Sequence, residues 1–320
     1  MSDQNLPENI LVQEKGLSKF DAIQKIPREV LWQANYDSVN TQQTYGFALK
    51  QFMGFLGIST TLQLRQVTQA HVIAFKKNLL AQGCKPRTVN NRLTTISSVF
   101  NDLIANQVVM VNPALGVRRL PVNYDRVEAK TMTPEQVRNM LNAPDLDKLM
   151  GKRDYAILST LFFTGCRVSE VTTLQVKDFY EEDEYDMLDF WVKGGKRNRL
   201  AVHPELAAAI KEYLDCAGHS QDKDSFLFLP IRNAPASSDP QRKLSRRSID
   251  YIFKKYARKL GLQDRTVHSA RATFITQALE NNCPIEHTQR SVGHAQLKTT
   301  QMYDKRVIKK RNSASFAVRY

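Results

Sequence analysis

Residues 268–306 read HSARATFITQALENNCPIEHTQRSVGHAQLKTTQMYDKR. The start of this stretch predicts a helix on which His268 and Arg271, three residues apart, leave the same face. His294 follows a glycine, and Tyr303 follows KTTQM near the end of a short helix or turn. A His-x-x-Arg pair alone is most often surface electrostatics, and a single tyrosine is most often a packing residue. Other parts of the sequence must therefore show whether these residues are ordinary surface and packing residues or serve one reaction together.

The composition favours a polyanionic partner. The 320-residue chain carries 46 Lys and Arg against 32 Asp and Glu, a formal net charge of +14 at pH 7. Such an excess usually indicates nucleic acid, although a basic surface can also face anionic lipid. No apolar run approaches the roughly 20 residues that cross a bilayer, and residues 1–16 lack the layout of a signal peptide. We therefore expect an intracellular protein without a membrane partner.

Neither the cysteines nor the remaining histidines predict a metal site. His219 and His287 have no partner at helical metal-ligand spacing, and we expect both on the surface. The four cysteines are scattered and form no CxxC pair, so reduced thiols packed mostly in cores are expected. These cysteines are Cys84, Cys166, Cys216 and Cys283. We expect no metal and no cofactor.

Hydrophobic periodicity predicts a mainly α fold in two domains. Residues 1–27 are weakly patterned and are expected to form a flexible arm. Residues 28–116 hold three or more amphipathic helices, which is typical of a small helical domain. Residues 117–131 are basic and lack helical periodicity, so they predict a linker. Residues 132–320 predict a mostly helical domain with a C-terminal tail and a small antiparallel sheet, including a hairpin around Gly194–Gly195.

One helix of the first domain presents polar and basic side chains on the face opposite its apolar stripe. It begins near Pro86, and its apolar residues are already committed to a core. The exposed face can enter a major groove or lie along phosphates. The expected DNA-binding residues are Lys85, Arg87, Thr88, Asn90, Asn91 and Arg92.

Three further residues extend the set formed by His268, Arg271, His294 and Tyr303. Arg167 follows a helix break at Gly165, where a guanidinium can project into a cleft, and Lys193 and Lys196 flank the two glycines of the hairpin. A phosphodiester at the centre explains the set. Guanidiniums and imidazoles can bind the charged oxygens of a phosphoryl transition state. A phenol can attack phosphorus and form a covalent ester, while lysine or histidine moves protons.

The order of these groups resembles the tyrosine recombinase (phage integrase) family over about residues 35–310. TGCRVSE resembles its first arginine box and implies Arg167 as catalytic, with Glu170 as a supporting carboxylate. VKGGKRNR is similar to its hairpin lysine motif and points to Lys193, with Lys196 a phosphate contact or a solvated charge. HSARATF and VGHAQLKTTQMYDK imply His268, Arg271 and His294 and the nucleophile Tyr303. PRTVNNRLTTISSVFNDLIANQVVMVNP is similar to the family's core DNA-binding domain.

The resemblance implies a site-specific DNA recombinase that works through a 3′-phosphotyrosyl intermediate without metal or ATP. It also implies a double-stranded site with inverted repeats, a homo-tetramer on DNA, a monomer free in solution, and a cytoplasmic location in a bacterial or mobile-element setting. A simple two-domain enzyme of Xer, Cre or transposon type fits the length best. A type IB-like topoisomerase shares this chemistry, and a non-catalytic DNA-binding regulator could keep the fold; relaxation of supercoils without site preference would favour the former.

Overall fold

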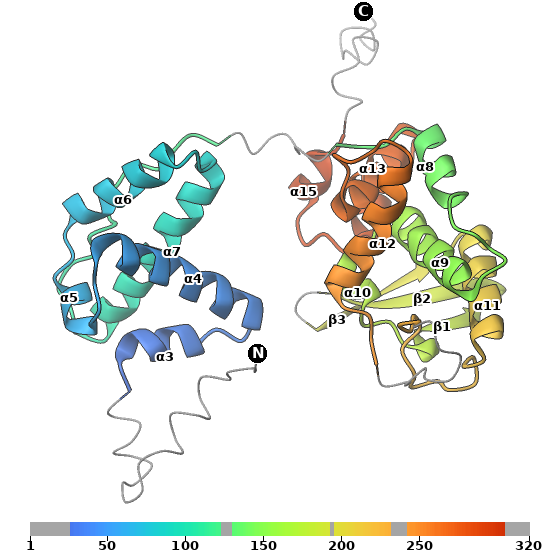
Figure 1. Cartoon of the computed structure of the whole chain (residues 1–320), viewed down its shortest axis with the longest axis horizontal. Helices are drawn as coiled ribbons and strands as arrows, with labels where there is room; N and C mark the ends of the chain where they lie inside the picture. Colours follow the sequence, from blue (N-terminus) through green and yellow to red (C-terminus); the bar gives the residue numbers. More distant parts are fainter. Residues whose placement is uncertain (1–25, 123–129, 193–194, 232–241, 305–320) are drawn as a thin grey trace, which may run out of the picture. The chain divides into compact units, whose positions relative to one another are not determined.

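The chain folds into two compact units, residues 1–123 and 124–320. The structure is a computed structural model that describes residues 26–122, 130–192, 195–231 and 242–304. Both units are mainly helical, and the second also holds a small antiparallel sheet (Figure 1). The predicted fold class is therefore confirmed. Within the described ranges, no helix combines the length and apolar composition needed to cross a membrane.

Unit 1 is built from helices that bury one aromatic and aliphatic core. Phe52, Phe75 and Phe100 are almost completely buried in it. The end of one helix and the start of another follow from single residues. Gly57 ends α4 in the left-handed conformation, and Pro86 opens α7 with a preset φ. The helices are α3 (Arg28–Ala34), α4 (Val39–Leu56), α5 (Thr61–Arg65), α6 (Gln69–Ala81) and α7 (Pro86–Ala105).

The segment after α7 is fixed to unit 1. Lys76 donates its Nζ hydrogen to the carbonyl of Arg118 at 2.7 Å. Asn90 donates to the carbonyl of Leu120 and accepts from its N–H, both at 2.9 Å. The first residues of the predicted linker thus pack on the helical unit. Residues 123–129, the arm up to residue 25 and the tail from residue 305 lie outside the described residues.

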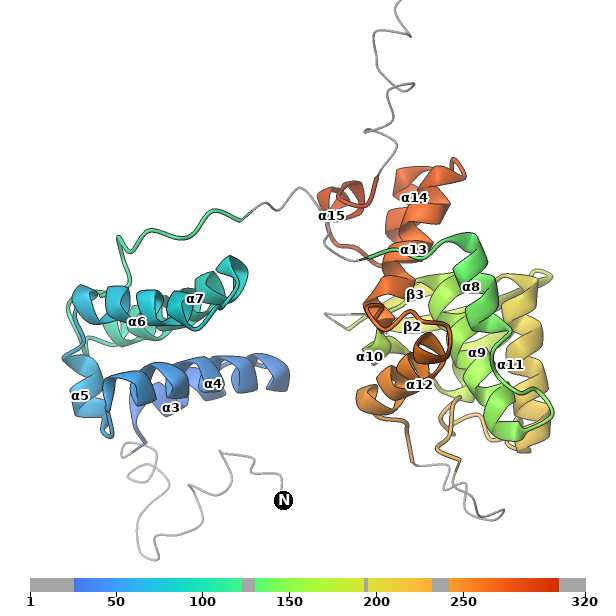
Figure 2. The ribbon, with the colours of Figure 1, turned by 45° about the horizontal axis from the view of Figure 1, so that its top comes forward.

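Unit 2 places its sheet and helices around a central helix, α9. Residues on every side of α9 are buried, and it contacts α8, α11, α12 and α13 (Figure 2). A helix whose residues are buried on every side lies in a core. The helices are α8 (Pro134–Leu141), α9 (Leu149–Thr164), α10 (Val168–Val171), the 3-10 helix η1 (Val176–Asp178), α11 (Pro204–Ala217), α12 (Arg246–Lys259), α13 (Val267–Glu280), α14 (Ile285–Ser291) and α15 (Leu297–Gln301).

The sheet contains the predicted hairpin and one strand that was not predicted. β2 (Tyr185–Val192) pairs with β3 (Lys196–Ala201) in antiparallel register, with Val192 opposite Lys196. β1 (Phe179–Glu182) pairs with the other edge of β2. The turn between β1 and β2 has positive φ at Asp183 and Glu184. Such a turn normally uses asparagine or glycine, so the sequence carried no clear hairpin signal there.

Three local expectations were wrong. The strand expected near residues 226–229 is a single bridge between Gln175 and Phe226. His219 is buried, not on the surface. Its ring lies edge-on to Tyr213, and its Nε2 is 3.3 Å from the carbonyl of Leu227. The histidine therefore has a packing role. Among the cysteines, only Cys166 is buried, and Cys216 is exposed, so the expectation of mostly buried thiols was also wrong.

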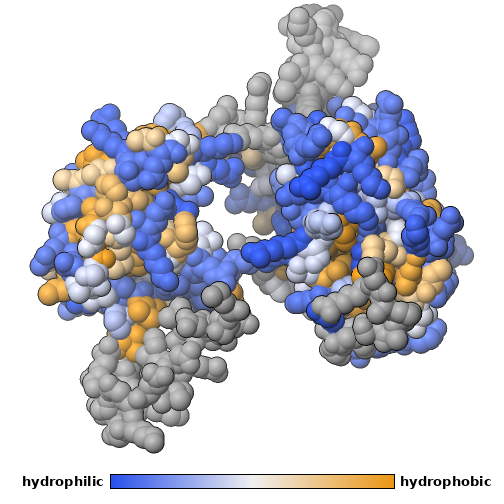
Figure 3. All heavy atoms as spheres, viewed as in Figure 1, coloured by the Kyte–Doolittle hydropathy of each residue, from blue (hydrophilic) through white to orange (hydrophobic). Residues whose placement is uncertain are grey.

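α12 separates a buried apolar face from a basic one. Ile249, Ile252 and Phe253 are buried, whereas Arg258 and Lys259 are exposed in its last turn. In Figure 3 hydrophilic side chains cover much of the visible surface of unit 2. The exposed basic residues of α12 attract a polyanion, in line with the net charge of the chain.

Candidate active site

The site begins where α9 ends. Gly165 adopts the left-handed conformation, with φ of 62°. A Cβ at this position would lie 2.5 Å from Cδ1 of Phe274, so both the backbone and the space require glycine. The break redirects the chain, and Arg167 becomes the N-cap residue of α10. It also turns the carbonyl of Gly165 toward α13.

Arg271 on α13 is a buried cation that two carbonyls orient. Its side chain is 3% exposed. One Nη donates to the carbonyl of Gly165 and the other to the carbonyl of Val292, both at 2.7 Å. Burial lowers the pKa of Arg271, and the positive charge of Arg167 lowers it further. Because an arginine stays protonated in proteins and carbonyls carry only partial charge, this arrangement favours binding of an anion.

Arg167 is held from behind by Glu170. Nη1 of Arg167 donates to one carboxylate oxygen of Glu170, and the main-chain N–H donates to the other, both at 2.7 Å. The Glu170 side chain is 5% exposed and that of Arg167 is 39% exposed. The carboxylate therefore fixes the guanidinium while part of it stays open to a ligand. Cys166, the residue before Arg167, is buried. Burial raises the pKa of its thiol to about 12, so Cys166 is not a nucleophile at neutral pH.

Tyr303 follows α15 and lies in a small apolar cluster with Ala272, Ile275 and Val292. Its phenol oxygen is 3.5 Å from Nε2 of His268, the outer limit of a hydrogen bond. Loss of hydration raises the pKa of Tyr303, while Arg271 and Arg167 oppose that rise. The phenol is therefore protonated at neutral pH, and its nearest imidazole is that of His268.

His268 is suited to accept that proton. Loss of hydration lowers its pKa most, and Arg271 and Arg167 lower it further. His268 is an exposed residue, so this loss of hydration is only partial. The lowered pKa favours the neutral imidazole, whose free nitrogen can take a proton from the phenol.

His294 is neutral for the same reasons, but more strongly. Loss of hydration, together with the charges of Arg271 and Arg167, lowers its pKa to about 3. Its ring stacks against the ring of Tyr303, with centroids 6.1 Å apart. Nδ1 lies 2.9 Å from the hydroxyl oxygen of Thr300. The imidazole thus offers a hydrogen-bond donor without a net charge.

The described part of the hairpin packs against the turn that precedes His294. Asn198 on β3 donates to the carbonyl of Ser291 at 3.0 Å. A Cβ on Gly293, whose φ is 61°, would lie 3.1 Å from Cγ1 of Val192. Lys196 is exposed at the first position of β3. Lys193 lies outside the described residues.

The structure therefore gathers five of the six predicted catalytic residues at the ends of α9, α13 and α15. Of the groups that hold them, the sequence predicted Glu170 but not the others. Thr300 had no distinguishing pattern within KTTQM, and the carbonyls of Gly165 and Val292 leave no signature in side-chain chemistry. Asn198 also went unnoticed, since asparagine within a hairpin is usually read as a surface residue.

The predicted DNA-binding residues at the start of α7 fall into two groups. Lys85, Arg87, Thr88 and Asn91 are exposed. Asn90 is bonded to Leu120, as described above. Arg92 donates from Nε to Oε1 of Gln51 at 3.0 Å, and its guanidinium lies 4.9 Å from the centre of the Phe47 ring. These contacts give Asn90 and Arg92 a structural role within unit 1.

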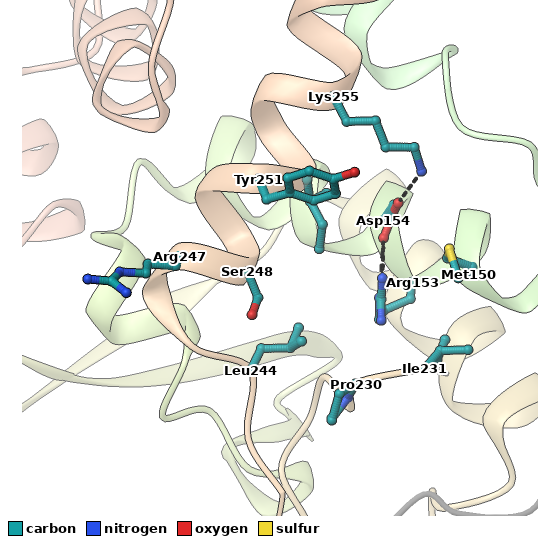
Figure 4. Close-up of a pocket in the computed structure, with 11 residues that line it drawn as sticks. Met150, Arg153, Asp154, Pro230, Ile231, Leu244, Arg247, Ser248, Tyr251 and Lys255 are labelled. Atoms are coloured by element: carbon teal, nitrogen blue, oxygen red, sulfur yellow. Dashed lines mark hydrogen bonds and ion pairs between the residues drawn. The ribbon is translucent and has the colours of Figure 1, made fainter. Parts of the chain in front are cut away.

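A separate pocket of about 570 Å³ lies between the first half of α9 and α12 (Figure 4). Asp154 accepts hydrogen bonds there from Arg153, Lys255 and Tyr256, which ties the two helices together. Arg153 is twelve residues before Gly165, about 18 Å along the axis of α9 at 1.5 Å per residue. The pocket is thus distinct from the site that contains Arg167 and Arg271.

The chain matches known families over most of its length. Residues 130–308 match the model described as the phage integrase family, and residues 28–107 match the one described as phage integrase, N-terminal SAM-like domain. The chain is similar to tyrosine recombinase XerC of Roseiflexus castenholzii, with 30% identity over 83% of each chain. It is 31% identical to tyrosine recombinase XerC of Herpetosiphon aurantiacus over 82% of this chain and 84% of that protein.

Two solved structures share the fold. The XerH site-specific recombinase bound to a palindromic difH substrate, in a post-cleavage complex, matches with a TM-score of 0.68 and 16% identity over 93% of this chain and 87% of that one. A lambda integrase tetramer bound to a Holliday junction matches with a TM-score of 0.66 and 17% identity, over 87% of this chain and 75% of that one.

Proposed function

The chain belongs to the phage integrase family of tyrosine recombinases, and we propose that Tyr303 is the nucleophile with which it cleaves and rejoins DNA. The observation that carries this assignment is the buried guanidinium of Arg271, oriented by two carbonyls beside Arg167 and a buried phenol. Such a cation calls for an anion. A phosphodiester supplies that anion and also the electrophile that a phenol can attack.

Cleavage is a transesterification, in which one phosphodiester bond replaces another. The phenol oxygen of Tyr303 forms a bond to phosphorus, and the bond from phosphorus to the 5′-oxygen breaks. His268 takes the phenolic proton, and Lys193 gives a proton to the leaving 5′-oxygen. The products are a 3′-phosphotyrosyl ester and a 5′-hydroxyl. Because one ester replaces another, the reverse reaction with a partner strand needs no ATP.

The positive and polar groups stabilise the charge that develops on phosphorus. Arg271 uses two of its five N–H hydrogens for the carbonyls, which leaves others for the non-bridging oxygens. Arg167, fixed by Glu170, and the neutral His294 add further donors. Fixed donors in a partly dehydrated site contribute strongly because they need little reorganisation during the reaction.

DNA recognition is assigned to unit 1 and the hairpin. The exposed side chains at the start of α7 are proposed to contact DNA, and Lys196 is proposed to contact a phosphate. The internal contacts of Asn90 and Arg92 favour an indirect role in DNA binding, in which they hold α7 and the segment after it in place. Phosphate contacts then set the register, and base contacts supply the sequence preference.

The proposed substrate is a double-stranded site with inverted repeats, bound by four copies of the chain. The two relatives crystallised on DNA support this assignment: one is on a palindromic substrate, and the other is a tetramer on a Holliday junction. We propose a monomer free in solution that assembles on DNA in the bacterial cytoplasm. A topoisomerase or a non-catalytic regulator is not favoured by the relatives.

The test begins with selection of bound duplexes from a random pool, which defines the recombination site. A plasmid with two such sites is then incubated with the purified chain in excess EDTA. We expect exchange between the sites, seen as new restriction fragments, and no exchange on a plasmid without them. Relaxation of supercoils on both plasmids alike, without exchange, would support a topoisomerase instead.

A further inference from the structure

Thr300 contacts both His294 and Tyr303. Its side chain is fully buried, and its hydroxyl oxygen lies 2.9 Å from Nδ1 of His294. Its main-chain carbonyl accepts a hydrogen bond from the N–H of Tyr303 at 3.0 Å. One residue of α15 therefore joins the imidazole to the segment that carries the phenol.

The direction of the hydroxyl bond determines which ring nitrogen of His294 carries a proton. A neutral imidazole has one N–H, and burial beside two arginines keeps His294 neutral. If Thr300 donates to Nδ1, the proton of the ring is on Nε2. If Nδ1 donates instead, the hydroxyl hydrogen of Thr300 needs another acceptor, and Nε2 presents a lone pair.

The buried position favours the first arrangement. Among the described residues, the Thr300 hydroxyl forms no other hydrogen bond, although several other threonines in the chain donate to the carbonyl four residues earlier. A buried hydroxyl hydrogen without an acceptor is unfavourable. Donation to Nδ1 satisfies both groups, and it leaves a donor on the opposite edge of the ring. A lone pair on that edge would repel a phosphate oxygen.

We propose that Thr300 is a positioning residue that donates to Nδ1 of His294 and holds the ring as the Nε2–H tautomer, ready to donate to a non-bridging oxygen of the scissile phosphodiester. The inference about the tautomer stands on the hydrogen bond, the burial of Thr300 and the neutral state of His294. The part about the phosphodiester rests on the proposed function. Because Thr300 also holds the main chain of Tyr303, displacement of α15 would release the donor and the nucleophile together.

The first test uses the free, full-length protein labelled with ¹⁵N in its histidine rings. His294→Gln identifies the signals of His294. In the parent protein and in Thr300→Ser, we expect the shifts of an imidazole protonated at Nε2. In Thr300→Val, which keeps the shape but loses the hydroxyl, both nitrogen shifts should move toward the average of two tautomers. Thr299→Val, at the adjacent half-buried threonine, should leave the spectrum unchanged.

Two spectra would overturn the inference. One is a parent spectrum that shows His294 protonated at Nδ1. The other is a Thr300→Val spectrum in which the His294 nitrogen shifts equal those of the parent. Thermal unfolding measured beside the spectra shows whether Thr300→Val is folded. If it is not, the parent spectrum and that of Thr300→Ser still decide the tautomer.

The second test measures covalent cleavage on the selected site. Loss of one oriented hydrogen bond predicts cleavage by Thr300→Val that is slower by roughly three- to tenfold. Thr300→Ser and Thr299→Val should cleave within about twofold of the parent, a margin well below that loss. Equal cleavage by Thr300→Val would contradict the link to the phosphodiester. If the parent itself forms no adduct, the proposed function fails while the tautomer result stands.

Discussion

Arg271→Lys keeps the buried positive charge but removes the fork that holds two carbonyls. A lysine ammonium at this depth can reach one of the carbonyls of Gly165 and Val292, which now accept bonds of 2.7 Å each. The other carbonyl is left buried and unpaired. Such a group costs about 1–3 kcal/mol, so the unfolding free energy should fall by that amount.

The effect on catalysis should be larger than the effect on folding. The variant loses at least one oriented donor to the phosphoryl oxygens, and loss of one such donor typically slows the chemical step by about 100- to 1000-fold. The assay is single-turnover cleavage of a nicked duplex that carries the selected site. The short 5′-hydroxyl fragment diffuses away, so the covalent protein–DNA adduct accumulates and is measured on a denaturing gel.

Arg290→Lys is the matched control, because Arg290 is exposed on α14. It should change neither urea unfolding nor the rate of adduct formation by a measurable amount. An Arg271→Lys variant that forms adduct within threefold of the parent rate would refute the phosphate-binding role of Arg271. A variant with parental stability would refute the cost assigned to the unpaired carbonyl.

Three further outcomes are expected. Gly165→Ala should lose about 1–3 kcal/mol of unfolding free energy, because φ is 62° and the Cβ meets the ring of Phe274; urea denaturation of parental midpoint would contradict this. The pKa of His294 is about 3 in the folded chain, against an ordinary value of 6.5. Below pH 6.5 the unfolded chain therefore binds a proton that the folded chain does not. The unfolding free energy falls as the pH drops through this range. Between pH 7.5 and 5.5 His294 should account for a loss of about 1 kcal/mol of unfolding free energy, allowing for its partial exposure. His294→Gln should lose less stability than the parent over this range by that amount. An equal pH dependence of stability in His294→Gln would argue against the lowered pKa. A substrate with sulfur in place of the bridging 5′-oxygen needs little protonation of its leaving group, so it should restore cleavage to Lys193→Ala; rescue of Lys196→Ala instead would exchange the two roles.

The sequence predicted those parts of the site that depend on side-chain type and local backbone. Gly165 ends α9 because a positive φ selects glycine, and this signal is visible in a single letter. The hairpin of β2 and β3 was visible for the same reason. His268 and Arg271 leave one face of a helix because they are three residues apart.

The parts that escaped prediction depend on tertiary contacts. The carbonyls that hold Arg271 come from residues 106 and 21 positions away in the sequence, so no local pattern marks them. The turn at Asp183 and Glu184 uses positive φ without glycine. Arg92 was expected on the exposed face of its helix, but it lies against Phe47 and Gln51. A long side chain can cover a neighbouring helix while its position along the helix looks exposed.

The central claim is that Tyr303 forms the covalent bond to DNA. The most direct measurement is mass spectrometry of the adduct trapped on the nicked duplex, digested to peptides, in excess EDTA. We expect the nucleotide on the peptide that contains Tyr303. Tyr303→Phe, which lacks only the phenol oxygen, should bind the site normally and form no adduct. A nucleotide on the peptide of Tyr251 or Tyr256, or an undiminished adduct in Tyr303→Phe, would contradict the claim.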